Sequence, residues 1–216
     1  QPTIGETVVV FGLGLIGILT CQLLLSNGCK VIGIDVDEWK CSKAMDLGIK
    51  TINSSRENSV NNVLSKTNQS GCDGVIITAS TKSNDLISDA AKMSRKRGRI
   101  VLVGVVGLNL NRSDFYEKEL SFQVSCSYGP GRYDTNYENK GIDYPLPFVR
   151  WTEQRNFETV LSLLNKNAID VNSLITKKIP LENFNKIYDN IESNKILGAI
   201  LEYSAETKVN QIKKFE

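Results

Sequence analysis

Histidine is absent from the 216-residue sequence, and the five cysteines, at positions 21, 29, 41, 72 and 126, include no C-x-x-C pair. Zinc sites need clustered cysteine, histidine or carboxylate ligands. We therefore expect this chain alone to build no zinc site. A Ser/His/Asp catalytic arrangement is excluded as well. The cysteines fit buried thiols in a reducing compartment, which favours a cytoplasmic location.

Long apolar runs are also lacking, because Gly, Asp or Lys interrupts every hydrophobic stretch. A helix that spans a membrane needs about 20 consecutive, mostly apolar residues. The opening Gln1-Pro2-Thr3 has neither the basic start nor the apolar core of a secretory signal. The sequence therefore predicts no membrane partner. With no Met at position 1, we expect residue 1 to be a boundary rather than the natural start.

The sequence has no large excess of positive or negative charge, because its net charge is only +2. This near-neutral balance argues against a nucleic-acid partner. The densest basic run covers residues 95–99, Arg-Lys-Arg-Gly-Arg. We interpret it as a helix C-terminus and the turn after it, where cations complement the helix dipole. Phosphate binding is the alternative. The composition, with 41% hydrophobic and 23% charged residues, is typical of one large α/β domain with at most a small appendage.

Strand-like and helix-like segments alternate over the first two-thirds of the chain. The expected strands are 8–11, 30–34, 50–53, 74–78, 99–103 and 120–125, and the expected helices are 16–27, 37–47, 57–66 and 85–93. This alternation indicates βαβ units in a parallel sheet, and right-handed crossovers leave few topologies. We predict the α/β class and a doubly wound, mostly parallel six-stranded sheet in the order 3-2-1-4-5-6.

The alternation is interrupted at residues 128–150, which contain Gly129-Pro130-Gly131 and the tyrosines 128, 133, 137 and 144. We expect a long ordered loop here, because its aromatic content argues against disorder. A helix over 151–164, a strand over 174–177, a helix over 181–191 that starts after Pro180, and a strand over 196–203 should follow. The predicted domains are 1–170, which includes loop 128–150, a helix/strand extension over 171–203, and a tail or linker over 204–216.

The motif Gly12-x-Gly14-x-x-Gly17 lies between the first strand and the helix after it. This context is the dinucleotide-binding fingerprint of the Rossmann fold. Gly12 permits the tight turn, Gly14 lets the backbone approach a pyrophosphate, and Gly17 lets the helix pack closely on the strand. N–H groups at the helix start, including those of Leu15 and Ile16, then favour the phosphate charge.

Asp35 ends the second strand, roughly twenty residues after the glycines. An acid at this place accepts hydrogen bonds from the adenosine ribose and repels a 2′-phosphate. The sequence therefore predicts NAD as cofactor, with NADP disfavoured. Lys40, one turn into the next helix, is a second candidate ribose contact. The alternative is that Asp35 only caps the following helix.

Two further segments follow the fourth and fifth strands. Ligands of open α/β sheets bind at the carboxyl ends of the strands, beside the point where the strand order reverses. We expect Val103, Gly104 and Val105 to hold a carboxamide through their backbone. We expect Ala79, Ser80 and Thr81 to flank the adenosine half. Ordinary strand-ending turns are the alternative for both segments.

Acid–base machinery is not evident in the sequence. There is no histidine, and the Tyr-x-x-x-Lys pair of short-chain dehydrogenases does not occur, since Lys140 follows Tyr137 at the wrong spacing. Either the chemistry uses groups outside this chain, or the chain only binds its ligand. The catalytic residues therefore stay unknown at this point.

The run from Gly5 to Gly17 resembles the cofactor domain of medium-chain, zinc-type alcohol dehydrogenases. The same likeness extends to Gln22 and to residues 28–35, 44–48, 98–104, 118–120 and 174–203. The resemblance implies that Gly12, Gly14 and Gly17 hold the pyrophosphate, Asp35 and Lys40 the adenosine ribose, and Val103 and Val105 the nicotinamide. It also implies that the last segment returns to a catalytic domain.

That family's catalytic domain, with its zinc ligands and proton relay, lies mostly before this segment and is missing here. The segment from Tyr128 to Asn156 departs from the family. It is similar to proteins in which a dehydrogenase half precedes a second Rossmann oxidoreductase half, often near polysaccharide genes. The resemblance implies a small-molecule substrate that carries an alcohol or sugar hydroxyl. The sequence does not identify this substrate. An exposed former domain interface favours a homo-oligomer.

Two other hypotheses keep the fold. In one, the chain is a non-catalytic NAD-binding sensor or scaffold, which the missing acid–base group favours. In the other, the ligand is a nucleotide-sugar or S-adenosylmethionine. Binding assays with these nucleotides distinguish them.

Overall fold

The computed structural model describes residues 1–185 and 195–203. The chain divides into two compact units, Gln1–Asp170 and Val171–Glu216. Each unit is described separately below.

The first unit is built on one six-stranded sheet in the order β3-β2-β1-β4-β5-β6, and every neighbouring pair is parallel. The predicted fold and strand order are therefore confirmed. The order reverses between β1 and β4. The strands are β1 Thr7–Phe11, β2 Lys30–Asp35, β3 Lys50–Asn53, β4 Cys72–Ile77, β5 Ser94–Leu102 and β6 Ser121–Val124.

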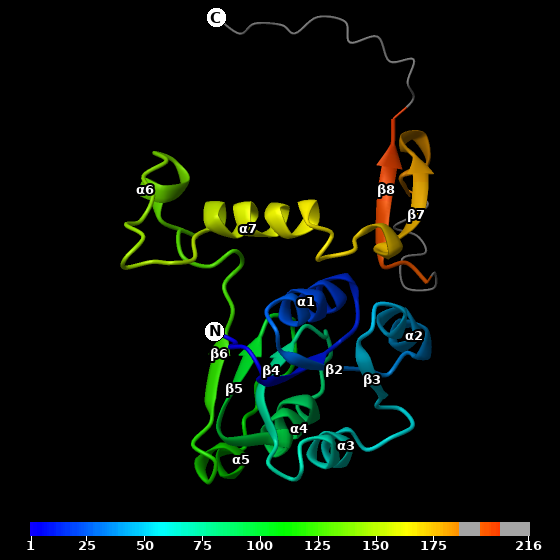
Figure 1. Cartoon of the computed structure of the whole chain (residues 1–216), viewed down its shortest axis with the longest axis vertical. Coiled ribbons are helices and arrows are strands. Elements are labelled where there is room, and N and C mark those ends of the chain that lie inside the picture. Colours follow the sequence, from blue (N-terminus) through cyan, green and yellow to red (C-terminus); the bar gives the residue numbers. More distant parts are fainter. Residues whose placement is uncertain (186–194, 204–216) are drawn as a thin grey trace, which may run out of the picture. The chain divides into compact units, whose positions relative to one another are not determined.

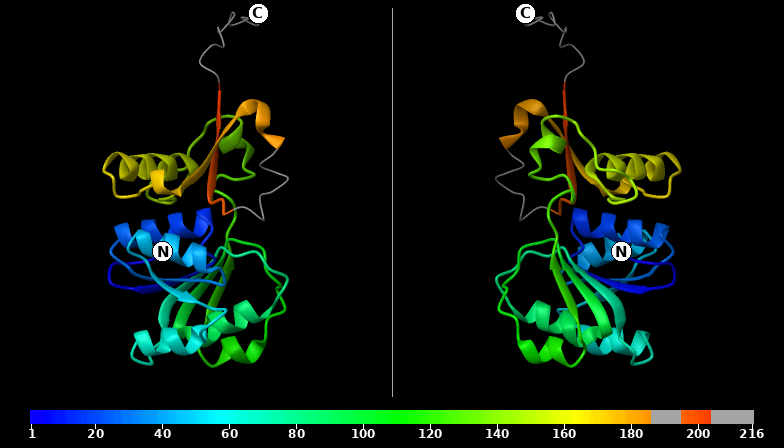
Figure 2. Two further views of the ribbon diagram at one scale, coloured as in Figure 1. Left: turned by 90° about the vertical axis from the view of Figure 1, so that its right-hand side faces the viewer. Right: turned by 90° about the vertical axis from the view of Figure 1, so that its left-hand side faces the viewer.

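Helices cover both faces of the sheet (Figures 1 and 2), with α1 and α2 on one face and α3, α4 and α5 on the other. Asp37 caps α2 and Asn58 caps α3, each accepting a hydrogen bond from a backbone N–H in the first turn. The helices are α1 Leu15–Ser26, α2 Glu38–Asp46, α3 Ser59–Lys66, α4 Asp85–Met93 and α5 Arg112–Tyr116.

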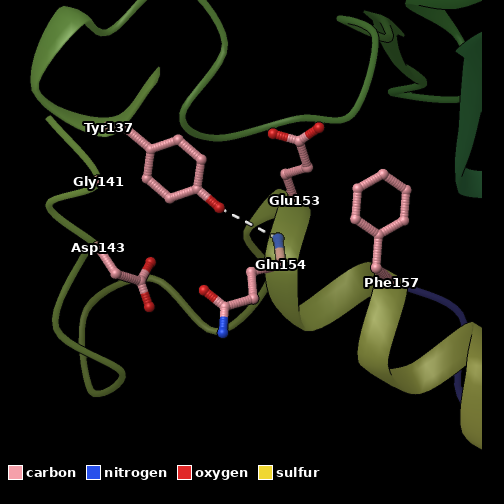
Figure 3. Close-up of a pocket in the computed structure, with 6 residues that line it drawn as sticks. All are labelled: Tyr137, Gly141, Asp143, Glu153, Gln154 and Phe157. Carbon is pink, nitrogen blue, oxygen red and sulfur yellow. Dashed lines mark hydrogen bonds between the residues drawn. The ribbon is translucent and has the colours of Figure 1, made fainter. Parts of the chain in front are cut away.

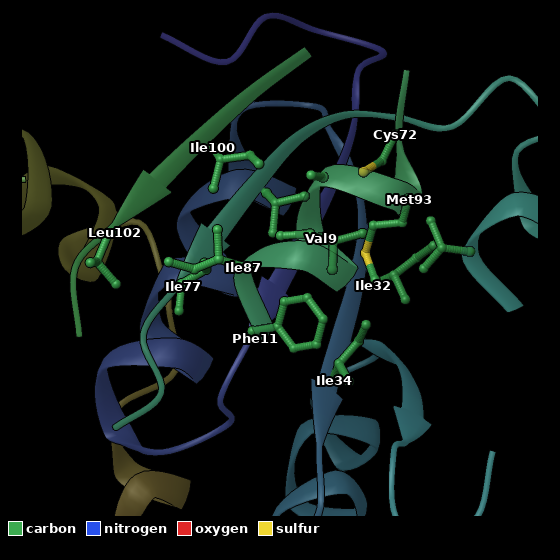
Figure 4. Packing of buried hydrophobic residues seen from close by; sticks show 14 of the residues in the cluster. Val9, Phe11, Ile32, Ile34, Cys72, Ile77, Ile87, Met93, Ile100 and Leu102 are labelled. Atoms are coloured by element: carbon green, nitrogen blue, oxygen red, sulfur yellow. The ribbon is translucent and has the colours of Figure 1, made fainter. Parts of the chain in front are cut away.

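The core lies between the sheet and its helices (Figure 4). Val9 and Phe11 of β1 pack with Ile77 of β4 and with Ile87 and Met93 of α4. All five side chains are buried. The continuous apolar runs of the central strands thus match burial on both faces, as expected for a parallel sheet.

The basic run 95–99 corrects a prediction, because it lies within β5 rather than at a helix C-terminus. Arg95 pairs with Asp73 at 2.6 Å and Arg99 pairs with Glu6. The cation at the end of α4 is instead Lys118, whose Nζ donates to the carbonyls of Ala91, Lys92 and Ser94. Local charge could not reveal this, because Lys118 reaches α4 from another part of the chain.

The segment after β6 contains a short helix, α6 Thr135–Glu138, which was not predicted, and then α7 Glu153–Asn165. The helix predicted over 151–164 corresponds to α7, which begins two residues later and ends one residue later. Turns make up most of the remaining residues between 128 and 150.

In the second unit, β7 Ile175–Pro180 and β8 Gly198–Glu202 form a parallel pair. Both were predicted as strands, with different ends. Short 3₁₀ turns, η1 Asn172–Leu174 and η2 Leu181–Asn183, flank β7. The helix predicted over 181–191 begins as η2, and its part from 186 onward lies outside the described residues. The predicted tail 204–216 also lies outside them.

Candidate dinucleotide-binding site

The candidate site lies at the edge where β1, β2, β4 and β5 end. The strand order reverses there between β1 and β4, which is the place where open α/β sheets bind ligands. Each of these strands is followed by one of the predicted segments. The fold thus brings residues 12–17, 35, 79–81 and 103–105 to one edge.

Gly12 makes the sharp turn out of β1 with φ +93°, and a Cβ added there would lie 2.7 Å from the Ala79 nitrogen. The Thr78 hydroxyl donates to the carbonyl oxygens of Gly12, at 2.7 Å, and Phe11, at 2.9 Å. Thr78 therefore fixes the turn from the end of β4. Sequence reasoning missed this residue, since no local pattern links it to the glycine motif.

The space around the Cα atom differs sharply between Gly14 and Gly17. A Cβ on Gly14 would have no atom within 4 Å, whereas a Cβ on Gly17 would lie 1.7 Å from the Gly12 carbonyl oxygen. Gly17 thus permits the close contact between α1 and the loop. Gly14 leaves open space over the backbone, as the predicted approach of a phosphate requires.

The N-terminus of α1 has free donors. Its first turn holds no acidic residue, and Gly14 at the N-cap provides no side-chain hydrogen bond. The first N–H bonded back into the helix is that of Ile18, which donates to the Gly14 oxygen at 2.9 Å. Leu15 and Ile16 lie before it with partly exposed side chains. The N–H groups of Leu15 and Ile16 have no partner among the described residues, and together with the helix dipole they favour an anion here.

Asp35 ties the end of β2 to the glycine loop. Its Oδ2 accepts from the Leu13 N–H at 2.6 Å and its Oδ1 from the Asp37 N–H at 2.9 Å. The cap of α2 is Asp37, which accepts from the Trp39 N–H at 2.8 Å. The alternative that Asp35 caps this helix is therefore wrong. The carboxylate keeps further lone pairs, because each oxygen accepts more than one hydrogen bond.

Lys40 lies in the first turn of α2 and is half-buried. No hydrogen bond or ion pair of its ammonium occurs among residues 1–185 and 195–203. The structure places it in the helix that follows Asp35, as predicted.

The ends of β4 and β5 adjoin one another. Ser80 and Val105 form a parallel bridge, and the Thr81 N–H donates to the Val105 oxygen at 2.9 Å. A Cβ on Gly104 would lie 2.0 Å from the Ala79 oxygen, so this position requires glycine. Val103 and Val105 are 42% and 73% exposed, which leaves both accessible at the candidate site.

Three cysteines are poor metal ligands or nucleophiles. Burial raises the pKa of Cys21 and Cys72 to about 12 and that of Cys41 to about 11, so all three stay protonated near neutral pH. In the part of the chain that the structure describes, no group of three or more His, Cys, Asp or Glu side chains is arranged to hold a metal ion.

No helix among the described residues combines the length and the apolar character needed to cross a membrane.

Comparison with known proteins gives a consistent family. A family model described as zinc-binding dehydrogenase matches residues 16–139. The NDMA-dependent alcohol dehydrogenase of Amycolatopsis methanolica is 26% identical over 203 residues, which are 94% of this chain and 50% of that protein. The sorbitol dehydrogenase of Halalkalibacterium halodurans is 26% identical over 208 residues, covering 91% of this chain and 52% of that protein.

Solved structures have the same fold. An alcohol dehydrogenase from a Thermus species has a TM-score of 0.73 at 23% identity, covering 94% of this chain and 52% of that one. The 2R,3R-butanediol dehydrogenase of Bacillus subtilis has a TM-score of 0.74 at 20% identity, covering 93% and 52%. The chain thus spans about half the length of the relatives it matches.

The family model covers more than half of the chain, including Gly17 and the whole of β2 with Asp35. The order of the strands and the glycine loop at their carboxyl ends agree with it. The chain therefore belongs to the zinc-binding dehydrogenases, and it is the nicotinamide-cofactor-binding domain of a zinc-type, medium-chain member of that family.

Proposed function

We propose that this domain binds NAD(H) in preference to NADP(H) and presents it for hydride transfer to or from an alcohol or sugar hydroxyl carbon. The observation that carries the cofactor preference is the Asp35 carboxylate at the end of β2, bonded to the Leu13 N–H of the glycine loop. A negative charge at this place accepts ribose hydroxyls and repels a 2′-phosphate.

The remaining predicted residues each take a part of the cofactor in this proposal. The uncapped start of α1, with Gly14, Leu15 and Ile16, holds the pyrophosphate. Lys40 supports the adenosine ribose beside Asp35. Ala79, Ser80 and Thr81 flank the adenosine half, and the backbone of Val103, Gly104 and Val105 orients the nicotinamide carboxamide.

The bound cofactor supplies the hydride chemistry at the nicotinamide C4. The task of this chain is to bind and orient it, since the sequence has no histidine for proton transfer. The substrate and the group that takes the hydroxyl proton belong, in this proposal, to a catalytic domain outside the chain. The described residues offer no donor set for the zinc after which the family is named, and we assign no step to it.

A second candidate function is a non-catalytic NAD-binding sensor or scaffold. The absence of histidine from the sequence favours it. It predicts the same cofactor contacts but no substrate turnover when a catalytic partner domain is present.

The test replaces the Asp35 carboxylate by its neutral isostere. We expect Asp35→Asn to weaken NADH binding and to narrow the preference for NADH over NADPH by roughly tenfold, because the carboxylate charge that repels a 2′-phosphate is removed. Calorimetric titration with both cofactors measures this. Asp46→Asn, at the end of the next helix α2, is the matched control, because its only ion pair among the described residues is with Lys43; it should leave the ratio unchanged. An unchanged ratio in Asp35→Asn would remove this residue from the site.

Titration of the unmodified protein distinguishes the ligand classes. Binding of a nucleotide-sugar or of S-adenosylmethionine, without binding of NADH, would show that the proposed function is wrong.

A further inference from the structure

A pocket of about 380 Å³ lies between the segment that precedes α7 and the first turns of α7 (Figure 3). It is lined by Tyr137, Gly141, Asp143, Glu153, Gln154 and Phe157. These residues have no role in the proposed cofactor binding. The contacts of their side chains show which groups are available to a ligand.

Side-chain contacts fix this segment, although it buries almost no apolar residues. The rings of Tyr137 and Tyr144 stack with centroids 5.8 Å apart, and the Tyr144 hydroxyl donates to Asp134 at 2.5 Å. Arg155 donates to Asp143 and to the Tyr144 carbonyl, both at 2.6 Å. The loop is thereby cross-linked to α7, and the pocket wall is preorganised.

Some polar groups at the pocket are already satisfied. Asp143 accepts from the Tyr144 N–H at 2.8 Å through Oδ1 and from Arg155 through Oδ2. The Tyr137 oxygen accepts from the Gln154 N–H at 3.1 Å, and the Gln154 side-chain nitrogen donates to Glu158 at 3.0 Å. These bonds position the side chains, and the atoms that form them are not available to a ligand.

Other groups remain available. The Glu153 carboxylate has no hydrogen bond or ion pair within the described ranges, and neither has the side-chain oxygen of Gln154. The Tyr137 oxygen is used as an acceptor, which leaves its O–H proton to donate. The Phe157 ring is 60% exposed. The pocket thus offers two acceptors, one donor and an aromatic face.

This combination selects among ligand classes. Hydroxyl groups both donate and accept, and the C–H face of a sugar or polyol packs on an aromatic ring. An anion is disfavoured by Glu153, whose charge the N-terminal end of α7 stabilises. A simple cation would leave the Tyr137 donor unused and would meet the Arg155 guanidinium beside Asp143.

We propose that this pocket is a binding site for an uncharged polyhydroxylated ligand, a sugar or polyol without a phosphate. Glu153 and Gln154 accept its hydroxyl hydrogens, Tyr137 donates to a hydroxyl oxygen, and Phe157 packs on its apolar face. The proposal does not depend on the cofactor, so binding is expected with NADH absent.

The test uses saturation-transfer difference NMR on the protein with D-glucose, sorbitol, glucosamine and glucose 6-phosphate as probes. D-glucose should give a clear transfer signal and glucose 6-phosphate none. A signal from glucosamine alone would show a cation site instead and would overturn the proposal, as would the absence of any signal from D-glucose and sorbitol. Because NADH binding is measured separately by calorimetry, failure here is distinct from failure of the proposed function.

Matched variants locate the binding. Phe157→Ala and Glu153→Gln should each reduce the affinity for D-glucose by roughly tenfold, because one removes the packing face and the other a charged acceptor. Phe148→Ala, at a residue that is 85% exposed in the same segment, and Glu57→Gln, outside it, should change nothing. Unaltered D-glucose binding in both pocket variants would place the ligand elsewhere and overturn the assignment.

Discussion

At the scale of single residues, the three glycines of the fingerprint are needed for different physical reasons. Gly12 has a positive φ and lies against Ala79, and Gly17 has no room for a Cβ beside the Gly12 oxygen. Gly14 has room for one, so the fold itself does not require glycine there. The proposed cofactor explains the glycine at this position, because the methyl group of an alanine would keep a phosphate away from the backbone.

Alanine substitution separates these roles. Gly17→Ala should lower the free energy of unfolding by about 3 kcal/mol, because backbone must move to admit the methyl group. Gly14→Ala should leave that free energy unchanged or up to about 1 kcal/mol higher, while NADH affinity falls by roughly tenfold or more. Urea unfolding and calorimetric titration measure the two effects. Normal NADH binding by Gly14→Ala would contradict the assigned pyrophosphate contact.

Residue types and spacing in the sequence predicted Gly12, Gly14, Gly17 and Asp35, but not Thr78. The hydroxyl of Thr78 and the Gly12 oxygen that it binds lie 66 residues apart along the chain. A threonine at the end of a strand is common, and only the pairing of β1 with β4 places it beneath the glycine turn.

At the scale of elements, ion pairs join the amino ends of the central strands. The Glu6 carboxylate, just before β1, pairs with Arg99 of β5, and Asp73 of β4 pairs with Arg95. Asp73 also accepts from the Thr7 N–H at 2.7 Å. These contacts lie at the opposite end of the strands from the candidate dinucleotide-binding site. Their role is therefore structural.

Partial burial by itself raises the pKa of both carboxyl groups. The hydrogen bonds and the charges outweigh this effect. Arg99 and the Thr3 N–H hold the pKa of Glu6 below its ordinary value of 4.5, and Arg95 and the Thr7 N–H hold that of Asp73 below its ordinary value of 3.8. A depressed pKa in the folded state means that the unfolded chain takes up protons first as the pH falls. The stabilisation is present above the ordinary values and is lost as the pH falls through the folded-state values.

We therefore expect stability to decline below about pH 4.5, by roughly 1 kcal/mol for each of the two carboxylates. Urea midpoints measured from pH 6 to pH 3 report this decline. The double variant Glu6→Gln, Asp73→Asn should show a smaller decline and a lower stability at pH 6. A decline as large as in the unmodified protein would mean that other groups cause the acid sensitivity.

The end of α4 shows why a charge pattern misled the sequence prediction. Residues 95–97 follow a predicted helix and carry the right charge for its C-terminus, yet they lie within β5. Lys118 satisfies the carbonyls instead, and its burial lowers the pKa of its ammonium. A helix end accepts a cation from any neighbouring element, so local sequence does not decide which one supplies it.

At the scale of the whole molecule, the chain covers about half of each relative described above. Its sequence supplies a complete set of the fingerprint glycines and the acidic residue after β2, but no histidine. In the proposed function, cofactor binding and proton transfer are divided between this domain and another part of the protein. The second oxidoreductase half, its link to polysaccharide metabolism and a homo-oligomeric state stay predictions.

This division predicts binding without turnover. The 216-residue chain alone should bind NADH but should not reduce NAD in the presence of sorbitol or simple alcohols, since its sequence has no histidine to accept the hydroxyl proton. Calorimetry and the absorbance of NADH measure the two properties. Measurable reduction of NAD by the chain alone would show that its own residues complete a catalytic site.

The sequence by itself determined the class of the fold and the order of the strands, and it predicted the residues of the candidate cofactor site. Apolar runs of strand length and the spacing of Gly12, Gly14, Gly17 and Asp35 are local patterns, and right-handed crossovers then restrict how the elements assemble. The tertiary structure alone decided the support of Gly12 by Thr78, the cap of α4 by Lys118, and the pocket around Tyr137, Glu153 and Phe157. Each of these brings together groups from separate parts of the chain, and such contacts exist only once the chain has folded.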